Sequence, residues 1–489
     1  MVDRHADHTL DDIRWTDYIT ININWFALTT RSQVLTPLVI PLLVQQFVGE
    51  ATKGAAVGRL RLWALMGALL FQAFMGLLTD RSTSKFGRRR PFIVIGTIGE
   101  LVVFMLIGFS TMLEGMTGYW VLFGLFLLSM LTSNTSQAAT QPLITDLVPE
   151  QKRGLFSGIK AALELPAPLI FVSFVVGGLI ARGALWGALF ALSAVLLICM
   201  TITLFIREKP RTDTPPPIDW RPLLRLLSMT GAFTALILLI GFLMGHVIDF
   251  SSGLSGVPQQ LVIGAAGLAG MGTAIGLGVW VSAKIGLGEA LTERPSFRWW
   301  VINRLAFLVG ANNLASFMVF FLQEKFPSFQ AEKAAGPAAR ILLFVGIFIL
   351  ITSIPSGWLS DRLGKKPLIA AAGALAVVGT VIVILAPGLQ VIFIGACLVG
   401  AGVGFFYSAN WALGTEIVPG DMAGRFFGVA NLAGAGAGAI GAYIGGPIAD
   451  ANSYVLLMSI YGGVMLLSTF ALMGVKTAPA RPAISPPAA

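Results

Sequence analysis

The chain has 489 residues, of which 56% are hydrophobic and only 12% are charged, and its formal net charge is +9. An ordinary soluble domain carries roughly 25% charged residues, so this composition argues against a soluble enzyme, a disulfide scaffold and a disordered chain. It indicates an integral membrane protein instead, in which each helix that crosses the bilayer needs about 20 apolar residues. The positive charges lie in short loops between apolar segments, so we expect no nucleic-acid partner.

An acidic segment at 1–17 opens the chain and lacks the positive start of a signal peptide, so we expect it to be cytoplasmic. The sequence then predicts a six-helix bundle at 18–206, a polar linker at 207–226, an inserted transmembrane hairpin at 227–284 and a second six-helix bundle at 285–475. We expect residues 476–489 to form a disordered tail. The fourteen predicted spans are 18–48, 59–79, 92–113, 119–144, 157–181, 185–206, 227–250, 259–284, 299–322, 338–359, 367–386, 390–413, 424–447 and 453–473.

The distribution of Lys and Arg predicts which way these spans face. Two of the 33 basic residues, Arg31 and Arg304, fall deep within spans, and 24 fall in segments or at span ends that are cytoplasmic if both termini are inside. This asymmetry is the one that the positive-inside rule predicts for cytoplasmic termini. The remaining seven fall in outer loops or at the outer ends of spans: Lys53, Arg59, Arg61, Arg182, Lys325, Lys333 and Arg340.

Two short motifs occur once in each six-helix half. GLLTDRSTSKFGRRRP at 76–91 is matched by GWLSDRLGKKP at 357–367, each between the second and third spans of its half. TDLVPEQKRG at 145–154 is matched by TEIVPGDMAGR at 415–425, each between the fourth and fifth spans. Because both copies keep the same place and orientation, they indicate a parallel repeat about an axis along the membrane normal.

With the motif Gly-x-x-x-Asp-Arg-x-Gly-[Arg/Lys]-[Arg/Lys] in both halves, the chain resembles the major facilitator superfamily over nearly its whole length. The longer first copy is most similar to the sucrose-transporter-like and glycoside-pentoside-hexuronide cation symporter branches. The resemblance implies an all-α membrane fold of two six-helix bundles around a central cavity, here with about 14 transmembrane helices including the hairpin. It also implies that the motif loops act as a conformational gate, although they could serve only as positive-inside anchors. The gate candidates are Gly76, Asp80, Arg81, Gly87, Arg88, Arg89, Arg90, Asp146, Arg153, Gly357, Asp361, Arg362, Gly364, Lys365, Lys366, Glu416 and Arg425.

Three ionisable residues are predicted at middle depth in the first half, where each costs roughly 3 kcal/mol or more. Arg31 could face the cavity and pair with a carboxylate of the protein or of the substrate, and Glu164 or Glu100 could take up a coupling proton. The alternative is a permanent buried ion pair. We favour Glu164 over Glu100 because the third helix of this fold usually packs outside the cavity.

Amide side chains are frequent on the first and fourth spans of each half. Such a lining suits hydroxylated ligands, and the same side chains could instead form interhelical hydrogen bonds. The predicted cavity residues are Asn24, Arg31, Gln33, Asn134, Gln137, Gln141, Glu164, Asn303, Arg304, Asn312, Asn313, Asn410, Trp411 and Asn431.

The fourth span departs from the pattern of plant-type sucrose–proton symporters. MLTSNTSQAATQPLITDL at 130–147 matches that pattern at Asn134, Gln137 and Asp146, among others. The membrane Asp that the family links to proton coupling falls on Met130, and the sugar-binding Arg falls on Gln141. Sucrose uptake by that mechanism is therefore not expected.

The leading functional hypothesis is a secondary transporter of a small polar organic solute, a sugar or glycoside, with a proton as candidate coupling ion. The alternative is a superfamily-derived assembly or delivery factor for a membrane pigment–protein complex, which no longer transports. An enzyme is the weakest option, because the three histidines form no metal-ligand or nucleophile constellation. We expect no cofactor, no metal and a monomer in the cell membrane.

Overall fold

The computed structural model describes residues 10, 12–208, 218–291, 294–418 and 423–476, and every regular element within these ranges is a helix. Thirteen of these helices are long and apolar enough to cross a membrane, and a bent pair of helices makes fourteen if it counts as one span. The predicted all-α membrane fold is therefore confirmed. The expected tail at 477–489 and the centre of the predicted linker lie outside the described residues.

The first half contains six spans, several of which are divided into shorter helices. The fifth span, for example, comprises α8, α9 and α10 with a π-helical turn between the last two. The elements are α1 (Trp15–Thr20), α2 (Ile23–Val34), η1 (Leu35–Val39), α3 (Ile40–Val48), α4 (Lys53–Asp80), α5 (Arg90–Ser110), α6 (Gly115–Thr140), α7 (Leu143–Leu147), η2 (Glu150–Lys152), α8 (Arg153–Glu164), α9 (Pro166–Phe171), η3 (Val172–Val176), α10 (Gly177–Ala181) and α11 (Leu185–Thr203).

The inserted hairpin consists of α12 (Arg221–Ser251) and α13 (Val257–Leu287), which are both longer than the predicted spans 227–250 and 259–284. A short 3-10 turn, η4 (Gly288–Leu291), leads toward the second half. The second half contains α14 (Pro295–Ser316), α15 (Met318–Lys325), η5 (Pro327–Phe329), η6 (Ala331–Ala334), α16 (Ala335–Leu363), α17 (Lys365–Leu385), α18 (Leu389–Ile417), α19 (Ala423–Ala451), α20 (Tyr454–Ala471) and η8 (Leu472–Gly474).

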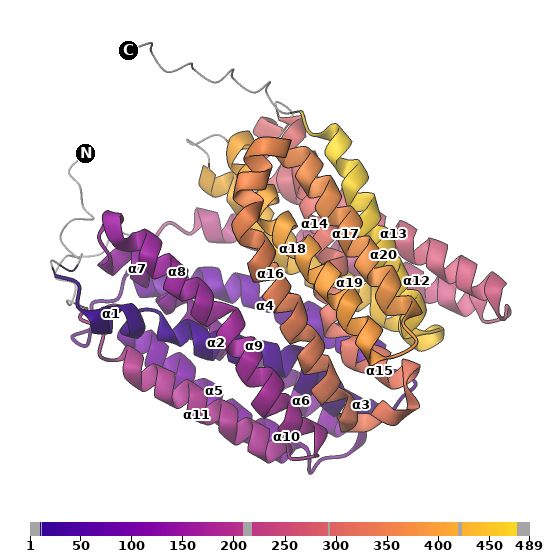
Figure 1. Cartoon of the computed structure of the whole chain (residues 1–489), viewed down its shortest axis with the longest axis horizontal. Coiled ribbons are helices and arrows are strands. Elements are labelled where there is room, and N and C mark those ends of the chain that lie inside the picture. Colours follow the sequence, from indigo (N-terminus) through magenta and orange to yellow (C-terminus); the bar gives the residue numbers. More distant parts are fainter. Residues whose placement is uncertain (1–9, 11, 209–217, 292–293, 419–422, 477–489) are drawn as a thin grey trace.

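The two halves meet along two pairs of helices. α4 of the first half packs along α19 of the second, and α9 and α10 pack against α16. Figure 1 shows the first half in indigo to magenta on one side and the second half in orange to yellow on the other. The hairpin lies at the edge of the second half, where α12 and α13 contact α19 and α13 also contacts α14 and α20.

Close contact between α4 and α19 depends on small residues. A side chain at Gly446 of α19 would collide with the carbonyl of Gly54 on α4. Glycine at such positions lets two membrane helices approach backbone to backbone, which strengthens van der Waals packing in the absence of a hydrophobic driving force. The interface between the halves is therefore tightest where α4 begins. We call this end of the molecule the Lys53 end and the opposite end the Asp80 end.

The predicted span at 299–322, the first of the second half, is bent rather than straight. α14 and α15 meet at Phe317 with an angle of 58°. Nearby side chains bind the backbone carbonyls of α14, since Asn313 Nδ2 donates to Val309 O at 2.8 Å and Ser316 Oγ donates to Asn312 O at 2.8 Å. Side-chain bonds of this kind compete with the backbone ladder and bend helices.

Candidate functional site

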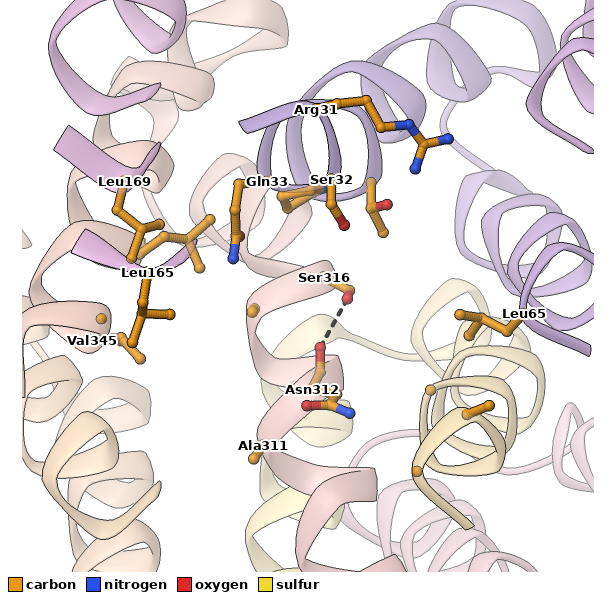
Figure 2. Close-up of a pocket in the computed structure, with 18 of the residues that line it drawn as sticks. Arg31, Ser32, Gln33, Leu65, Leu165, Leu169, Ala311, Asn312, Ser316 and Val345 are labelled. Carbon is orange, nitrogen blue, oxygen red and sulfur yellow. Dashed lines mark hydrogen bonds between the residues drawn. The ribbon is translucent and has the colours of Figure 1, made fainter. Parts of the chain in front are cut away.

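A cavity of about 670 Å³ lies between the two halves (Figure 2). Its volume is within the range of roughly 300–1,000 Å³ that small-molecule sites occupy. Residues of α2, η1, α4, α6 and α9 line it from the first half, and residues of α14, α16, α18 and α19 line it from the second. Most of the polar lining comes from the first half. The polar lining residues are Arg31, Ser32, Gln33, Thr36, Arg61, Ser133, Asn134, Gln137, Asn312, Ser316 and Tyr407.

Two helix breaks lie in the wall of this cavity. A π-helical turn interrupts the first span, and Pro37 lies at its centre. The fifth span breaks at Leu165, directly before Pro166. Proline has no backbone N–H and its ring clashes with the preceding turn, so it disrupts the regular hydrogen-bond ladder. Because Pro37 and Leu165 both line the cavity, the irregular backbone lies where a ligand would bind.

Arg31 forms a buried ion pair with Glu100 of α5. Arg31 Nε lies 2.8 Å from Glu100 Oε1, and the two side chains are 5% and 2% exposed. Glu100 also accepts hydrogen bonds from the hydroxyls of Ser129 and Thr132. The carboxylate of Glu100 is thus held by three side chains, and the ion pair leaves Arg31 without a charge to offer a ligand. Figure 2 shows that Arg31 and Asn312 lie on separate helices on facing walls and that the Arg31 side chain runs sideways from its helix.

Arg61 is a second arginine in the lining, although the sequence analysis counted it with the outer loops and outer span ends. α4 begins at Lys53, so Arg61 lies two turns inside the helix, where it is 5% exposed. Its Nη1 donates to Asn313 Oδ1 of α14 at 3.0 Å. This hydrogen bond joins the two halves at the wall of the cavity.

Five of the predicted cavity residues line the cavity together. Besides Arg31, they are Gln33 on α2, Asn134 and Gln137 on α6, and Asn312 on α14. Asn134 Nδ2 donates to the carbonyl of Met130 at 2.7 Å. The amide lining predicted for the first and fourth spans is thus present in the first half, whereas the second half contributes mainly apolar residues.

Other predicted cavity residues of the first half lie elsewhere. Asn24 is buried between helices, where its amide donates to Ser136 Oγ at 3.1 Å and to Thr140 Oγ1 at 2.6 Å. Gln141 is exposed and accepts a hydrogen bond from Gln72 at 3.4 Å. These residues join neighbouring helices instead of lining the central cavity.

Glu164 is not among the residues that line the cavity in the described part of the chain. Its carboxylate lies 3.6 Å from Lys160 Nζ, one turn earlier on α8, and its side chain is 40% exposed. Lys160 Nζ in turn lies 3.9 Å from the centre of the Trp25 ring. Glu100, which the sequence analysis ranked below Glu164, is the acid that contacts Arg31.

A polar cluster of the second half joins α14 to α18. Asn410 Nδ2 donates to Asn303 Oδ1 at 2.9 Å, and Arg304 Nη1 donates to Asn410 Oδ1 at 3.2 Å. The Arg304 guanidinium lies 5.1 Å from the centre of the Trp411 ring. These four predicted residues therefore lie together, and none of them is among the residues that line the cavity. Asn431 on α19 is exposed.

The basic loop of the first half forms a network at the Asp80 end. Arg89 is 2% exposed and pairs with Asp80 at 2.6 Å and with Asp146 at 2.9 Å. Arg88 also pairs with Asp146, and Arg153 donates to the carbonyl of Val148 at 3.0 Å. Each of these contacts joins elements of the same half.

Glu208 belongs to this network, and the sequence analysis did not identify it. Its carboxylate accepts hydrogen bonds from the backbone N–H of Arg89 at 2.8 Å and of Arg90 at 3.4 Å, at the start of α5. Gly87 has a φ of +104°, and a side chain there would collide with Glu208. Burial raises the pKa of the Glu208 carboxyl, which these hydrogen bonds oppose. Only its position directly after the sixth predicted span, at the same end as the basic loop, indicates from the sequence that Glu208 could join this network.

The second-half loops form fewer contacts of the same kind. Lys365 pairs with Glu416, and the Arg362 guanidinium lies 4.1 Å from the centre of the Trp358 ring. Arg425, another of the gate candidates, donates to carbonyl oxygens at the end of α13. The hairpin thus contacts the first turn of α19.

At the Lys53 end, a carboxylate of the second half caps a helix of the first. Asp450 accepts hydrogen bonds from the backbone N–H of Gly54 at 2.8 Å and of Ala55 at 2.7 Å. Lys53 is 6% exposed, and its Nζ donates to Gln323 Oε1 at 3.1 Å. A negative charge is favourable at a helix N-terminus. These contacts hold the two halves together at this end.

Comparison with known proteins gives the same architecture. The model of the Major Facilitator Superfamily matches residues 24–328 and 326–489. The sucrose transport protein SUC3 of Arabidopsis thaliana is 27% identical over 197 residues, which are 33% of each chain. The chain covers about a third or less of the length of the curated relatives it matches.

Two solved structures share the fold. The nucleoside transporter NupG superposes with a TM-score of 0.60 at 13% identity, over 94% of this chain and 99% of that one. The xylose transporter XylE from E. coli, in an inward open conformation, superposes with a TM-score of 0.62 at 15% identity, over 95% of this chain and 97% of that one. Because the family model matches nearly the whole chain and the helices form two halves around one cavity, this multi-pass membrane protein belongs to the Major Facilitator Superfamily.

Proposed function

We propose that the chain is a secondary transporter that moves a small polar organic solute, a sugar or glycoside, across the cytoplasmic membrane by alternating access. In this proposal the two bundles at 18–206 and 285–475 move against each other, the hairpin at 227–284 follows the second bundle, and one copy of the chain is sufficient. Both termini are cytoplasmic, so the Lys53 end is extracellular.

The observation that best supports this proposal is the cavity itself. It lies between the two halves and not within either of them, so a ligand there contacts both. Its amide and hydroxyl side chains, among them Gln33, Asn134, Gln137 and Asn312, are suited to bind hydroxyl groups. The matches to a sucrose transport protein and to a myo-inositol transporter are consistent with a hydroxylated solute.

Contacts at the two ends suggest how access alternates. The hydrogen bonds of Asp450 and Lys53 would close the extracellular side in the described state. The networks around Arg89 and Lys365 at the Asp80 end would favour the other state, in which the Asp80 end is closed. Glu100, beside Arg31, and Glu164 are the candidates for a coupling proton. A ligand moves such an equilibrium only when it binds one state more tightly.

The test is uptake by proteoliposomes that contain the purified chain, over a panel of sugars, polyols and glycosides, with and without an imposed pH gradient. Accumulation of one solute above protein-free vesicles supports the proposal, and stimulation by an inward proton gradient supports proton coupling. Equal uptake of every solute by both kinds of vesicle would contradict it. The comparisons do not favour the assembly-factor alternative.

A further inference from the structure

The cavity contains one positive charge that no carboxylate of the described residues neutralises. Of its two lining arginines, Arg31 is paired with Glu100, and no Asp or Glu is among the described lining residues. Arg61 is buried about 12 Å along α4 from Lys53 at a rise of about 1.5 Å per residue. No described Asp or Glu lies within ion-pair distance of its guanidinium. An isolated buried charge is costly, so it needs a compensating group.

One edge of the Arg61 guanidinium has no partner. Nη1 donates to Asn313 Oδ1, and the Asn313 amide is held by its own bonds to Val309 O at 2.8 Å and Ala437 O at 3.1 Å. Nε is buried without a hydrogen bond, and Nη2 bonds to none of the described residues. Nη2 is the donor that remains for a carboxylate oxygen in the cavity, and the enclosed Nε leaves the charge of the guanidinium without a counterion.

The internal repeat shows that this charge is specific to the first half. When Gly76 is aligned with Gly357, the residue equivalent to Arg61 is Leu342, which also lines the cavity. The neighbouring lining residues of the second half include Val345 and Ile349. The cavity therefore offers a cationic group on one wall and an apolar surface on the other.

We propose that Arg61 binds the carboxylate of the transported solute, so that the substrate is a small organic acid and not a neutral sugar. This inference rests on the proposed transport of a small polar organic solute, and within that class it replaces the neutral sugar or glycoside with an acid. A charge-assisted hydrogen bond from Nη2 to the carboxylate would neutralise the remaining charge. A neutral hydroxyl group would supply an acceptor without neutralising the guanidinium. Because Arg61 also bonds to Asn313, an acid bound there would contact the junction between the halves.

Matched acids and alcohols provide the test. The purified full-length chain is melted with gluconate or glucitol, which share a hydroxylated body, and with 3-phenylpropanoate or 3-phenylpropanol, which share an apolar body. At least one acid is expected to raise the melting temperature, while its alcohol does not. Arg61→Gln should raise the Kd of that acid about tenfold or more, and Arg61→Lys should retain part of the binding.

Arg59→Gln is the control, because Arg59 lies two residues earlier on α4 and is exposed. It removes the same charge and should leave binding of the acid unchanged. The inference is overturned if no acid stabilises the chain, if an alcohol stabilises it as well as its acid, or if stabilisation by the acid persists in Arg61→Gln. Uptake of the same four probes by proteoliposomes separates the two proposals. Uptake of glucitol without uptake of gluconate would support the transport proposal and contradict the proposal that the substrate is an acid. Binding of an acid without uptake of any probe would contradict the transport proposal.

Discussion

Arg31 and Glu100, 69 positions apart in the sequence, form a buried ion pair that joins α2 to α5 beside the cavity. The Ser129 hydroxyl of α6 donates to Glu100 Oε1 at 2.5 Å and accepts a hydrogen bond from Arg31. Three helices of the first half thus meet at one pair of charges. A charged arginine at this depth costs free energy, and its ion pair with the carboxylate offsets that cost.

Removal of one partner should therefore destabilise the first half. Arg31→Gln leaves Glu100 as an unpaired buried charge, so we expect a loss of roughly 3–5 kcal/mol of stability. Glu100→Gln should behave similarly. The double variant should be more stable than the sum of the two single losses predicts, because neither charge remains. Thermal melting of the four proteins in detergent measures this cycle, and strictly additive losses would show that the two charges are not coupled.

Arg61→Gln, unlike Arg31→Gln, should not lower the stability of the ligand-free protein. No described carboxylate pairs with Arg61, so its removal leaves no charge behind and relieves the cost of burying the guanidinium. We expect a ligand-free melting temperature equal to or above that of the parent chain, in contrast to the marked fall in Arg31→Gln. A fall as large as that of Arg31→Gln would show that the bond to Asn313 is essential for the fold.

The spans and the hairpin could be predicted from hydropathy because each needs a long apolar run, which is a local property of the sequence. The position of Arg61 could not. Counting charges by loop does not say where a helix begins, and α4 begins six residues before the predicted start at 59. Those six residues place Arg61 two turns inside α4, in the cavity wall, and not at the outer end of the span.

The sequence could not decide between Glu100 and Glu164, because the answer depends on which face of each helix points toward Arg31. Both lie at middle depth along the chain, but α5 is apolar nearly all round, so no polar stripe indicates which way Glu100 faces. The bend at Phe317 was equally hidden, because no proline or glycine marks it and side-chain bonds from Asn313 and Ser316 supply the cause.

Glu208 should make stability depend on pH. Burial raises the pKa of its carboxyl above the ordinary value of 4.5, against the opposing effect of the hydrogen bonds from the backbone of Arg89 and Arg90. The folded state therefore binds this proton more tightly than the unfolded state. Its contribution to stability is fully present below pH 4.5 and is lost as pH rises through the raised pKa. The melting temperature of the parent chain should fall relative to Glu208→Gln over that range.

Glu150→Gln serves as the control for this measurement, because Glu150 is exposed at the same end of the molecule. The difference between this variant and the parent chain should stay nearly constant over the same pH range. A constant difference for Glu208→Gln as well would show that the carboxyl at the start of α5 does not titrate with folding.

Asp450→Asn should make the cavity open more often at the Lys53 end. Asp450 caps the first turn of α4 through Gly54 and Ala55, and the substitution removes the negative charge that this helix end favours. A loss of about 1–2 kcal/mol at this contact would raise the population open at the Lys53 end by roughly 5- to 30-fold. Gln33→Cys, placed in the cavity lining of a chain without Cys199 and Cys397, reports the change through its rate of alkylation by a membrane-impermeant maleimide added outside. Asp249→Asn removes a charge from an exposed site on the hairpin and should leave that rate unchanged. An unaltered rate in Asp450→Asn would mean that the cap on α4 does not control access to the cavity.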